Sequence, residues 1–401
     1  MMDTDSAANV VYFDNAATSW PKPPQVQSAM VDFLARVGGS PGRSGHRMSI
    51  AASRLVGDAR DALAQLFNVA DPSRIAFTKN STEALNIAIL GWLRPEASAE
   101  RLQPGDHVIT TSVEHNSMMR PLRFLEQQGR IELTVVPCSP TTGNLDPDEV
   151  RRALRPQTRL LAIVHASNVI GTLLPLREIG AIAHAAGVPL LVDASQTAGA
   201  YPIDVEALGI DMLAFTGHKS LLGPTGTGGL YLREGLDLDP LTRGGTGSRS
   251  ELEFQPDFMP DKYESGTLNV LGIAGLGAGV QFLLDQGVEE VHRHEQALVA
   301  RFLAGAAGLP GLVVYGPQDL EQRIGVLSFN IVGVSSSRVG LILDQGFGIM
   351  TRIGLHCAPA AHHTIGTFPN GTVRFGFSYF NTLSEVDYAL QALARILEER
   401  D

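Results

Sequence analysis

Cysteine and basic residues are scarce in this chain of 401 residues, which has 2 cysteines and 31 Lys plus Arg against 42 Asp plus Glu. Two cysteines, Cys138 and Cys357, cannot build a disulfide framework, so each thiol needs its own explanation. The net charge of −11 leaves no basic face to neutralise the phosphates of a nucleic acid or of an anionic membrane. We therefore expect no nucleic acid and no membrane among its partners.

Long apolar runs and nucleotide-binding motifs are also missing. No run of about 18 apolar residues occurs that could span a bilayer, and residues 1–10 carry acids rather than the apolar core of a secretory signal. These features predict a cytoplasmic protein. No G-x-x-x-x-G-K-[ST] motif occurs, and the glycines at 244–247 lack the strand-turn-helix setting of a dinucleotide site, so nucleotide cofactors are not expected.

Short β-rich runs alternate with helix-like stretches between residues 75 and 232. The runs are 75–78, 107–111, 131–136, 160–165, 189–193, 212–216 and 229–232. This alternation predicts an α/β fold with a mostly parallel sheet covered by helices on both faces. The run at 160–164 is apolar throughout, which is typical of a strand buried on both sides.

The pattern changes after residue 241, where residues 241–267 are rich in Gly, Ser, Pro and charges. Beyond Leu268 a long helical stretch follows, and the C-terminal part contains strands at 326–331 and 373–378 and a helix at 383–399. This change indicates a second, smaller α/β domain.

Lys219 and Asp193 each follow an apolar strand. A lysine at the end of a buried strand is costly unless it has a task, and Schiff-base chemistry needs a desolvated amine with a lowered pKa. Pyridoxal phosphate (PLP) also needs an acid against its pyridine nitrogen, a role that suits Asp193. Taken singly, a solvated lysine and a helix-capping aspartate are the ordinary interpretations.

Further polar residues follow other strands. Ser81 and Thr82 begin a predicted helix, whose free amides and hydroxyls could bind a phosphate, although capping explains them equally well. His115 and Asn168 are placed at the carboxyl edge of the sheet, where open α/β sheets bind ligands. His115 could stack on a flat cofactor and move protons.

Cys357 follows His356 and lies near Arg352 in sequence, surroundings that favour a reactive thiolate, whereas Cys138 ends an apolar run and is expected to be a buried hydrophobe. The histidines around Cys357 match no zinc pattern, so no metal is expected. Arg374, in a β-run, is either paired to a protein acid or available for a substrate carboxylate.

Eight motifs, in order along nearly the whole chain, resemble the class V aminotransferase-like PLP enzymes, and within them the cysteine desulfurase and selenocysteine lyase group, in its SufS-like branch. The motifs are Tyr12-Phe13-Asp14-Asn15-Ala16-Ala17-Thr18, Asn80-Ser81-Thr82-Glu83, Glu114-His115-Asn116, Ser167-Asn168-Val169-Ile170-Gly171, Val192-Asp193-Ala194-Ser195-Gln196, Thr216-Gly217-His218-Lys219, Glu264-Ser265-Gly266-Thr267 and Arg352-x-Gly-x-His356-Cys357. Leu355 and Thr216 depart from residues common in that branch, a second histidine and a serine.

The resemblance implies the PLP-dependent transferase fold type I, with a seven-stranded sheet in a large domain at 15–282 and a small domain formed by 1–14 and 283–401. It further implies a homodimer. The residues implied to hold PLP are Lys219, which binds it covalently, Asp193, His115, Asn168, Gln196, Ser81, Thr82, Thr216 and His218, with Gly266 and Thr267 reaching the phosphate in the partner subunit. Arg374 would bind the substrate carboxylate, and Arg352, Asn15, Ala17 and His46 would lie nearby.

The activity implied is that of a cysteine desulfurase. Lys219 removes the Cα proton of L-cysteine, Cys357 takes the sulfur as a persulfide, His115 donates a proton, and L-alanine leaves. The implied context is sulfur metabolism such as iron–sulfur cluster assembly, with a sulfur-acceptor protein as a possible partner. Three alternatives stay open: a selenocysteine lyase, a PLP lyase or aminotransferase acting on another amino acid, and a scaffold without turnover.

Overall fold

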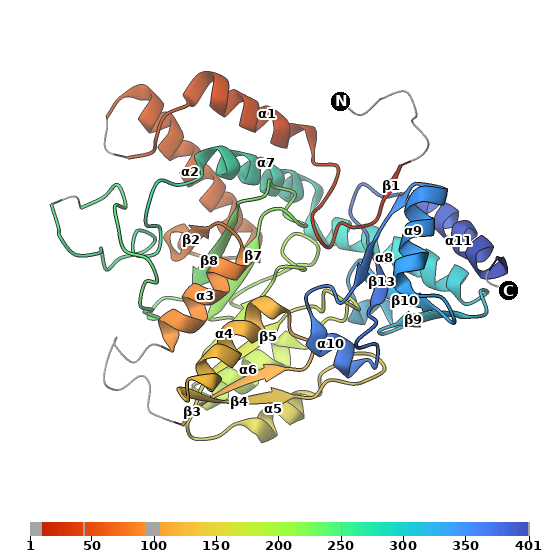
Figure 1. Cartoon of the computed structure of the whole chain (residues 1–401). Helices are drawn as coiled ribbons and strands as arrows, with labels where there is room; N and C mark the ends of the chain where they lie inside the picture. The colour runs from red at the N-terminus through yellow and green to blue at the C-terminus, as the bar shows by residue number, and fades with distance from the viewer. Residues whose placement is uncertain (1–9, 43–44, 94–104, 250, 400–401) are drawn as a thin grey trace.

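A seven-stranded sheet forms the centre of the larger part of the molecule in the computed structural model, which describes residues 10–42, 45–93, 105–249 and 251–399 (Figure 1). The strand order is β2-β8-β7-β6-β5-β3-β4, and β8 is the strand that runs antiparallel to its neighbours. The strands are β2 (Ile75–Thr78), β3 (Asp106–Thr111), β4 (Ile131–Val136), β5 (Thr158–Val164), β6 (Leu190–Asp193), β7 (Met212–Thr216) and β8 (Gly228–Leu232). The predicted mostly parallel sheet is thus confirmed, with strand ends that differ by two residues or fewer.

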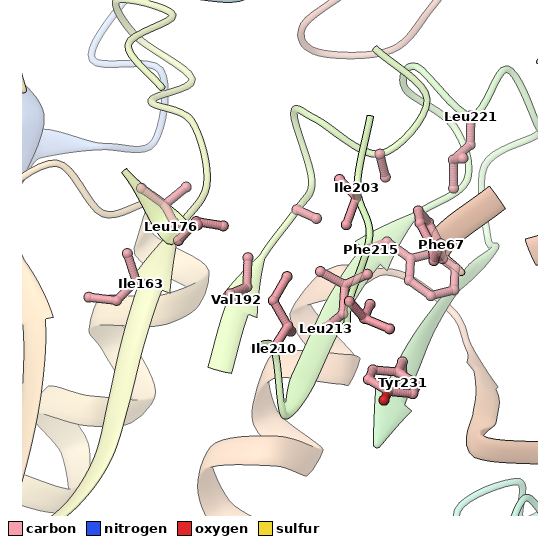
Figure 2. Close-up of a cluster of buried hydrophobic side chains, with 14 of the residues drawn as sticks. Phe67, Ile163, Leu176, Val192, Ile203, Ile210, Leu213, Phe215, Leu221 and Tyr231 are labelled. Carbon is pink, nitrogen blue, oxygen red and sulfur yellow. The ribbon is translucent and has the colours of Figure 1, made fainter. Parts of the chain in front are cut away.

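Helices cover both faces of this sheet, because successive strand residues point to opposite sides. One face carries α2 (Arg47–Phe67), α5 (Pro147–Ala153), α6 (Leu176–Ala186) and α7 (Val270–Gln286), and the other carries α3 (Ser81–Trp92) and α4 (Asn116–Gln127). In β5, Leu161 packs into the first layer and Leu160 into the second. Figure 2 shows part of the first layer, where the rings of Phe67 and Phe215 lie 5.2 Å apart.

The glycines of α7 allow close helix packing. This helix contacts α2 and also α1 (Pro24–Asp32), which continues into the helical turn η1 (Phe33–Val37). A Cβ atom at Gly277 would lie 3.0 Å from the Cβ of Ala59 in α2, which is tighter than ordinary contact. The composition of α7 is therefore explained by its position between two other helices.

A second, four-stranded antiparallel sheet, of order β12-β13-β10-β9, belongs to the C-terminal part. Its strands are β9 (Leu312–Tyr315), β10 (Val326–Ile331), β12 (Arg352–Gly354) and β13 (Thr372–Gly376). The helices α8 (Val288–Ala306), α9 (Ser336–Phe347) and α11 (Leu383–Glu398) pack with it around a separate apolar core. The predicted small α/β unit is therefore present, and β9 and β12 are strands that sequence analysis missed.

The N-terminal segment joins this second unit, since β1 (Val11–Tyr12) pairs in parallel with β11 (Ile349–Met350). The predicted division between residues 282 and 283 stays a prediction, because α7 continues through it to Gln286. The helices η2 (Pro72–Arg74), η3 (Leu320–Gln322) and α10 (Pro359–Thr364) are short. Among the described helices none is by itself long and apolar enough to cross a membrane, and only α7 with α8, bent by 82°, pass that test together.

The loop after β5 connects the two units. The backbone N–H of Ile324 donates to the carbonyl of Gly171 at 2.9 Å, and Thr172 forms a bridge with Arg323. A Cβ at Gly171 would lie 2.1 Å from the carbonyl oxygen of Val326, so this close approach requires glycine. The loop that carries Asn168 is thereby fixed against the second sheet.

Candidate active site

Asp193 is buried at the carboxyl end of β6, beside the ends of β5 and β7. Its Oδ1 accepts from the backbone N–H of Ser195 at 2.9 Å and from the Ser195 hydroxyl. Both bonds use Oδ1, so the other carboxylate oxygen, Oδ2, is available to pair with or accept a hydrogen bond from another group. A buried carboxylate needs such a partner, because desolvation of an unpaired charge is costly.

Lys219 lies in the turn after β7, and no described residue hydrogen-bonds its Nζ. Burial lowers the pKa of Lys219 to about 8, while the charges of Asp193 and Cys357 act in the opposite direction. Roughly a tenth of this amine is therefore unprotonated at pH 7, against less than about one part in a thousand for an ordinary lysine, as suits a nucleophile or base.

Residues near the N-terminus clamp the peptide that joins His218 to Lys219. The carbonyl of His218 accepts from the backbone N–H of Ser19 at 3.0 Å, from the hydroxyl of Thr18 at 3.1 Å and from Nζ of Lys22 at 2.8 Å. The hydroxyl of Ser19 also donates to the carbonyl of Lys219 at 2.7 Å. Sequence analysis missed Ser19 and Lys22, because nothing local marks a contact across 200 residues.

His115 caps α4 with its side chain. Its Nδ1 accepts from the backbone N–H of Ser117 at 3.1 Å and lies 2.8 Å from the Ser117 hydroxyl. Since Nδ1 is an acceptor, the ring carries its proton on Nε2. Burial, reinforced by the charge of Lys219, lowers the pKa of His115 to about 4, so the ring is neutral at neutral pH.

Glu114, the residue before His115, is fully buried, and sequence analysis assigned it no role. Its Oε1 accepts from the Thr111 hydroxyl at 2.7 Å and from the backbone N–H of Val164 at 2.9 Å, while Oε2 has no partner. Burial raises the pKa of Glu114 to about 8, against the effect of these two hydrogen bonds. Because Val164 pairs with Asp193, this neutral acid adds no second negative charge near Asp193.

The raised pKa of Glu114 predicts a pH-dependent stability. Folding raises this pKa from 4.5 to about 8, so the associated stabilisation is complete below pH 4.5 and is lost as the pH rises through 8. Glu114→Gln removes the titration. Between pH 4.5 and about pH 8, the unfolding free energy of the variant minus that of the natural protein should increase by about 1.4 kcal/mol for each unit of rising pH. Urea unfolding of both proteins at about pH 5 and about pH 7.5 measures this, and equal differences at both would contradict it.

The expected phosphate-binding residues gather around the N-terminus of α3. Ser81 is its buried first residue, and a Cβ at Gly228 in β8 would lie 2.8 Å from Cα of Asn80. The Thr216 hydroxyl, at the end of β7, donates to the carbonyl of Thr227 at 3.4 Å. The first-turn amides of α3 and nearby hydroxyls can bind an anion.

Two more residues expected at the cofactor lie in the same region. Burial lowers the pKa of His218 to about 4, so its ring is neutral. The amide of Gln196 donates from Nε2 to the carbonyl of Ala16 at 3.0 Å, which fixes that side chain and places Ala17 next to it in the chain.

Four predicted residues have other surroundings. His46 is exposed and caps α2, where its Nδ1 accepts from the backbone N–H of Ser49 at 3.2 Å. Gly266 and Thr267 are exposed in a loop. The amide nitrogen of Asn15 bonds to two backbone carbonyls and to Asn381. Like the roles of the other predicted site residues, the cofactor and substrate roles of these four residues stay predictions.

Cys357 is exposed in a tight turn after β12, while Cys138 is buried. The carbonyl of Cys357 accepts from the backbone N–H of Asn116, next to His115, at 2.9 Å. Burial raises the pKa of Cys138 to about 11, which agrees with the expected inert thiol. Cys357 is therefore the accessible sulfur nucleophile in the described part of the chain.

Arg374 lies behind this turn and is 2% exposed. Its Nη1 donates to the carbonyl of Asn168 at 2.9 Å, and its Nη2 pairs with Oδ1 of Asp14 at 3.1 Å, while Nε has no partner. Arg352 lies 3.7 Å from the other oxygen of Asp14. Of the two interpretations of Arg374, pairing with a protein acid is thus observed, and binding of a substrate carboxylate stays a prediction.

A cavity of about 470 Å³ opens beside Cys357. His115, Thr82, Arg120 and Phe124 also line it. It therefore joins the thiol to the residues at the carboxyl edge of the sheet, and it can hold a small molecule. Within the described residues, no group of three or more His, Cys, Asp or Glu side chains is arranged to hold a metal ion.

Comparison with known proteins finds similarity over nearly the whole chain. The family model described as Aminotransferase class-V matches residues 11–389. A probable cysteine desulfurase of Methanothermobacter thermautotrophicus is 36% identical over 97% of this chain and 94% of its own length. A cysteine desulfurase of Escherichia coli O157:H7 is 34% identical over 96% of this chain and 93% of its own. The apo structure of a cysteine desulfurase from Thermococcus onnurineus NA1 superimposes with a TM-score of 0.90 at 34% identity, covering 97% of this chain and 95% of that one.

Proposed function

Because the chain belongs to the aminotransferase class-V family, we propose that it is a PLP-dependent cysteine desulfurase, which converts L-cysteine into L-alanine and transfers the sulfur to Cys357. Membership of this family also confirms the expected fold type I. The observation that carries the proposal is the position of Cys357. An exposed thiol shares one cavity with His115 and interacts electrostatically with Lys219, the amine of lowered pKa.

The residues present fit PLP. Lys219 offers an amine that no described residue hydrogen-bonds, Asp193 offers a buried carboxylate oxygen, and Ser81 begins a helix whose amides can bind a phosphate. The neutral ring of His115 interacts electrostatically with Lys219 and Asp193, and Asn168, which donates to the carbonyl of His356, is the further residue we assign to the cofactor. When bound, PLP supplies an aldehyde for the amine of the substrate and a ring that accepts electrons.

Lys219, Cys357 and His115 then have separate roles in the proposed reaction. The amine of Lys219 accepts the Cα proton of cysteine, for which its lowered pKa is suited. The thiolate of Cys357 attacks the sulfur of the substrate, so that an S–S bond forms while the C–S bond breaks. The electron pair of the C–S bond stays with the three-carbon product, which gains protons and leaves as alanine. His115, protonated on Nε2, is suited to donate a hydrogen bond in this step.

Arg374 is the proposed site for the substrate carboxylate. Its guanidinium is buried, interacts electrostatically with Cys357, and retains one nitrogen, Nε, without a hydrogen-bond partner. Arg352 adds a second positive charge next to Asp14. Positive charge here supports both a bound carboxylate and a thiolate at Cys357.

The proposal extends to a homodimer in which Gly266 and Thr267 reach the phosphate in the partner subunit, since both are exposed in a loop of this chain. It also includes a cytoplasmic location and an acceptor protein that takes sulfur from Cys357. Membership of the SufS-like branch stays a prediction. The named relatives are cysteine desulfurases, so selenocysteine lyase activity is not favoured.

The direct test uses the purified protein, its visible absorbance and a reductant that releases sulfide from Cys357. We expect a yellow protein that produces alanine and sulfide in equal amounts from L-cysteine. Turnover of L-selenocysteine alone would establish the lyase instead. A yellow protein inactive on both substrates would overturn the substrate assignment, and a protein that neither contains nor binds PLP would overturn the cofactor assignment.

A further inference from the structure

The turn that carries the thiol has an unfavourable backbone. His356 and Cys357 are consecutive residues with φ of 49° and 56°, in the left-handed region. A side chain makes this conformation costly, and neither residue is glycine. Such a turn persists only when its surroundings hold it in place.

A buried chain of hydrogen bonds starts at the ring of His356. Its Nε2 lies 3.0 Å from the hydroxyl of Thr372 in β13, which donates to the hydroxyl of Ser328 in β10 at 3.0 Å. The Ser328 hydroxyl in turn donates to the carbonyl of Val169 at 2.6 Å. Thr372 and Ser328 are fully buried, and His356 is 5% exposed. The chain thus links the turn to the loop after β5.

The end of this chain fixes the position of every proton in it. A carbonyl only accepts, so the Ser328 hydroxyl must donate to Val169. The Thr372 hydroxyl must then donate to Ser328, and Nε2 of His356 must donate to Thr372. The remaining nitrogen of His356, Nδ1, is buried without a partner, and a buried N–H group there would be costly.

His356 is therefore neutral. Burial, reinforced by the charge of Arg374, lowers the pKa of His356 to about 2. A neutral His356 brings no positive charge to the Cys357 thiolate, because burial and the lack of an acceptor at Nδ1 disfavour a second proton on the ring. The positive charges near the thiol belong to Lys219 and Arg374.

We infer that His356 is a positioning residue for Cys357, whose ring, held by the hydroxyls of Thr372 and Ser328, fixes the strained turn that aims the thiol at the substrate. Two hydrogen bonds to backbone carbonyls of the turn complete the anchorage. Asn168 donates from Nδ2 to the carbonyl of His356 at 2.7 Å, and Asn116 donates from its backbone N–H to the carbonyl of Cys357 at 2.9 Å. These bonds hold the turn of the thiol against the loop after β5, which carries Asn168, and against the N-terminus of α4, which begins at Asn116.

This inference rests on the proposed function, in which Cys357 receives the sulfur. Its test uses a matched pair of variants of the PLP-loaded protein at Thr372, a buried position that does not line the cavity. Thr372→Val removes the hydroxyl and keeps the shape of the side chain, whereas Thr372→Ser keeps the hydroxyl. A third variant, His356→Gln, replaces the ring by a neutral donor of similar reach.

For Thr372→Val we expect kcat for alanine formation to fall about tenfold or more while KM for L-cysteine changes less than about twofold, because orientation of the thiol is lost but binding is not. The absorbance of the cofactor should respond to L-cysteine at an unchanged rate. Thr372→Ser should restore kcat to within about twofold of the natural protein. Equal kcat values in the two Thr372 variants would overturn the inference.

The pH profile of Cys357 alkylation separates positioning from charge. Iodoacetamide labelling without substrate, located by peptide mass spectrometry, gives the pH midpoint at which the thiol becomes reactive. We expect His356→Gln to leave this midpoint unchanged. A rise of about one pH unit or more would mean that a positive His356 stabilises the thiolate, and would overturn the inference.

The test also covers two complications, a Thr372→Val variant that does not fold and a natural protein without desulfurase activity. If Thr372→Val does not fold, Ser328→Ala breaks the same chain at its next hydroxyl and should lower kcat in the same way; an unchanged kcat in that variant would overturn the inference. If the natural protein forms no alanine from L-cysteine, the proposed function fails. The alkylation midpoints still decide whether His356 is neutral, because they require no turnover.

Discussion

Cys357→Ser should lower the production of alanine and sulfide from L-cysteine by at least about 10³-fold, because a serine hydroxyl is not ionised near neutral pH and cannot take up sulfur. The variant should stay yellow, since Cys357 takes no part in the proposed binding of PLP. L-cysteine should still change the absorbance of the cofactor. Coupled assays for alanine and sulfide, beside the absorption spectrum, measure all three properties.

Cys138→Ser is the matched control for this variant. Cys138 is the other thiol of the chain, and its buried position with a pKa raised to about 11 makes it inert. Its replacement should leave the rate of alanine formation within about twofold of the natural rate. Alanine formation that survives in Cys357→Ser would instead support a PLP lyase or aminotransferase for which Cys357 is incidental.

Lys219→Ala should remove the covalent bond between cofactor and protein together with at least about 10³-fold of the activity, because the variant lacks both the amine that binds the aldehyde and the base that accepts the Cα proton. After reduction with borohydride, peptide mass spectrometry of the natural protein should find the cofactor on residue 219. The same treatment of Lys219→Ala should leave it unbound.

Lys22 offers an internal comparison, because burial lowers its pKa to about 8, as it does for Lys219. Unlike Lys219, its Nζ donates hydrogen bonds to Ser19 and to the carbonyl of His218. Lys22→Met should therefore keep the cofactor bound covalently at residue 219. Borohydride labelling that moves to Lys22, or that persists in Lys219→Ala, would show that the cofactor lysine has been assigned wrongly.

The strands of the large sheet could be predicted because their signal is local. Burial on both faces demands a continuous apolar run, and β5 has one in Leu161, Ile163 and their neighbours. β12 could not be found in this way, since it is three residues long and pairs with β13, about 20 residues later in the chain. β1 likewise exists only because it pairs with β11.

The residue types of the candidate site could also be predicted, but their protonation and partners could not. A lysine and an aspartate at strand ends, His115 before a helix and Cys357 among glycine, histidine and arginine are features that sequence order preserves. The roles of the residues next to them could not be predicted from the sequence. His356 was expected to assist the thiolate by its position in the chain, yet its ring is neutral and bonded to Thr372 in another strand.

By itself the sequence determined the α/β class, the sheet strands and the residue types that chemistry requires, because periodicity, apolar runs and strand-end polar residues are properties of short segments. Only the tertiary structure decided the protonation and pairing of those residues. Desolvation and hydrogen bonding depend on what surrounds a group in space, and here the surroundings come from distant segments. Asp14 forms an ion pair with Arg374, and Ser19 and Lys22 hydrogen-bond the backbone of the turn that carries Lys219. The position of the proton on His356 is set by the carbonyl of Val169 at the far end of its hydrogen-bond chain.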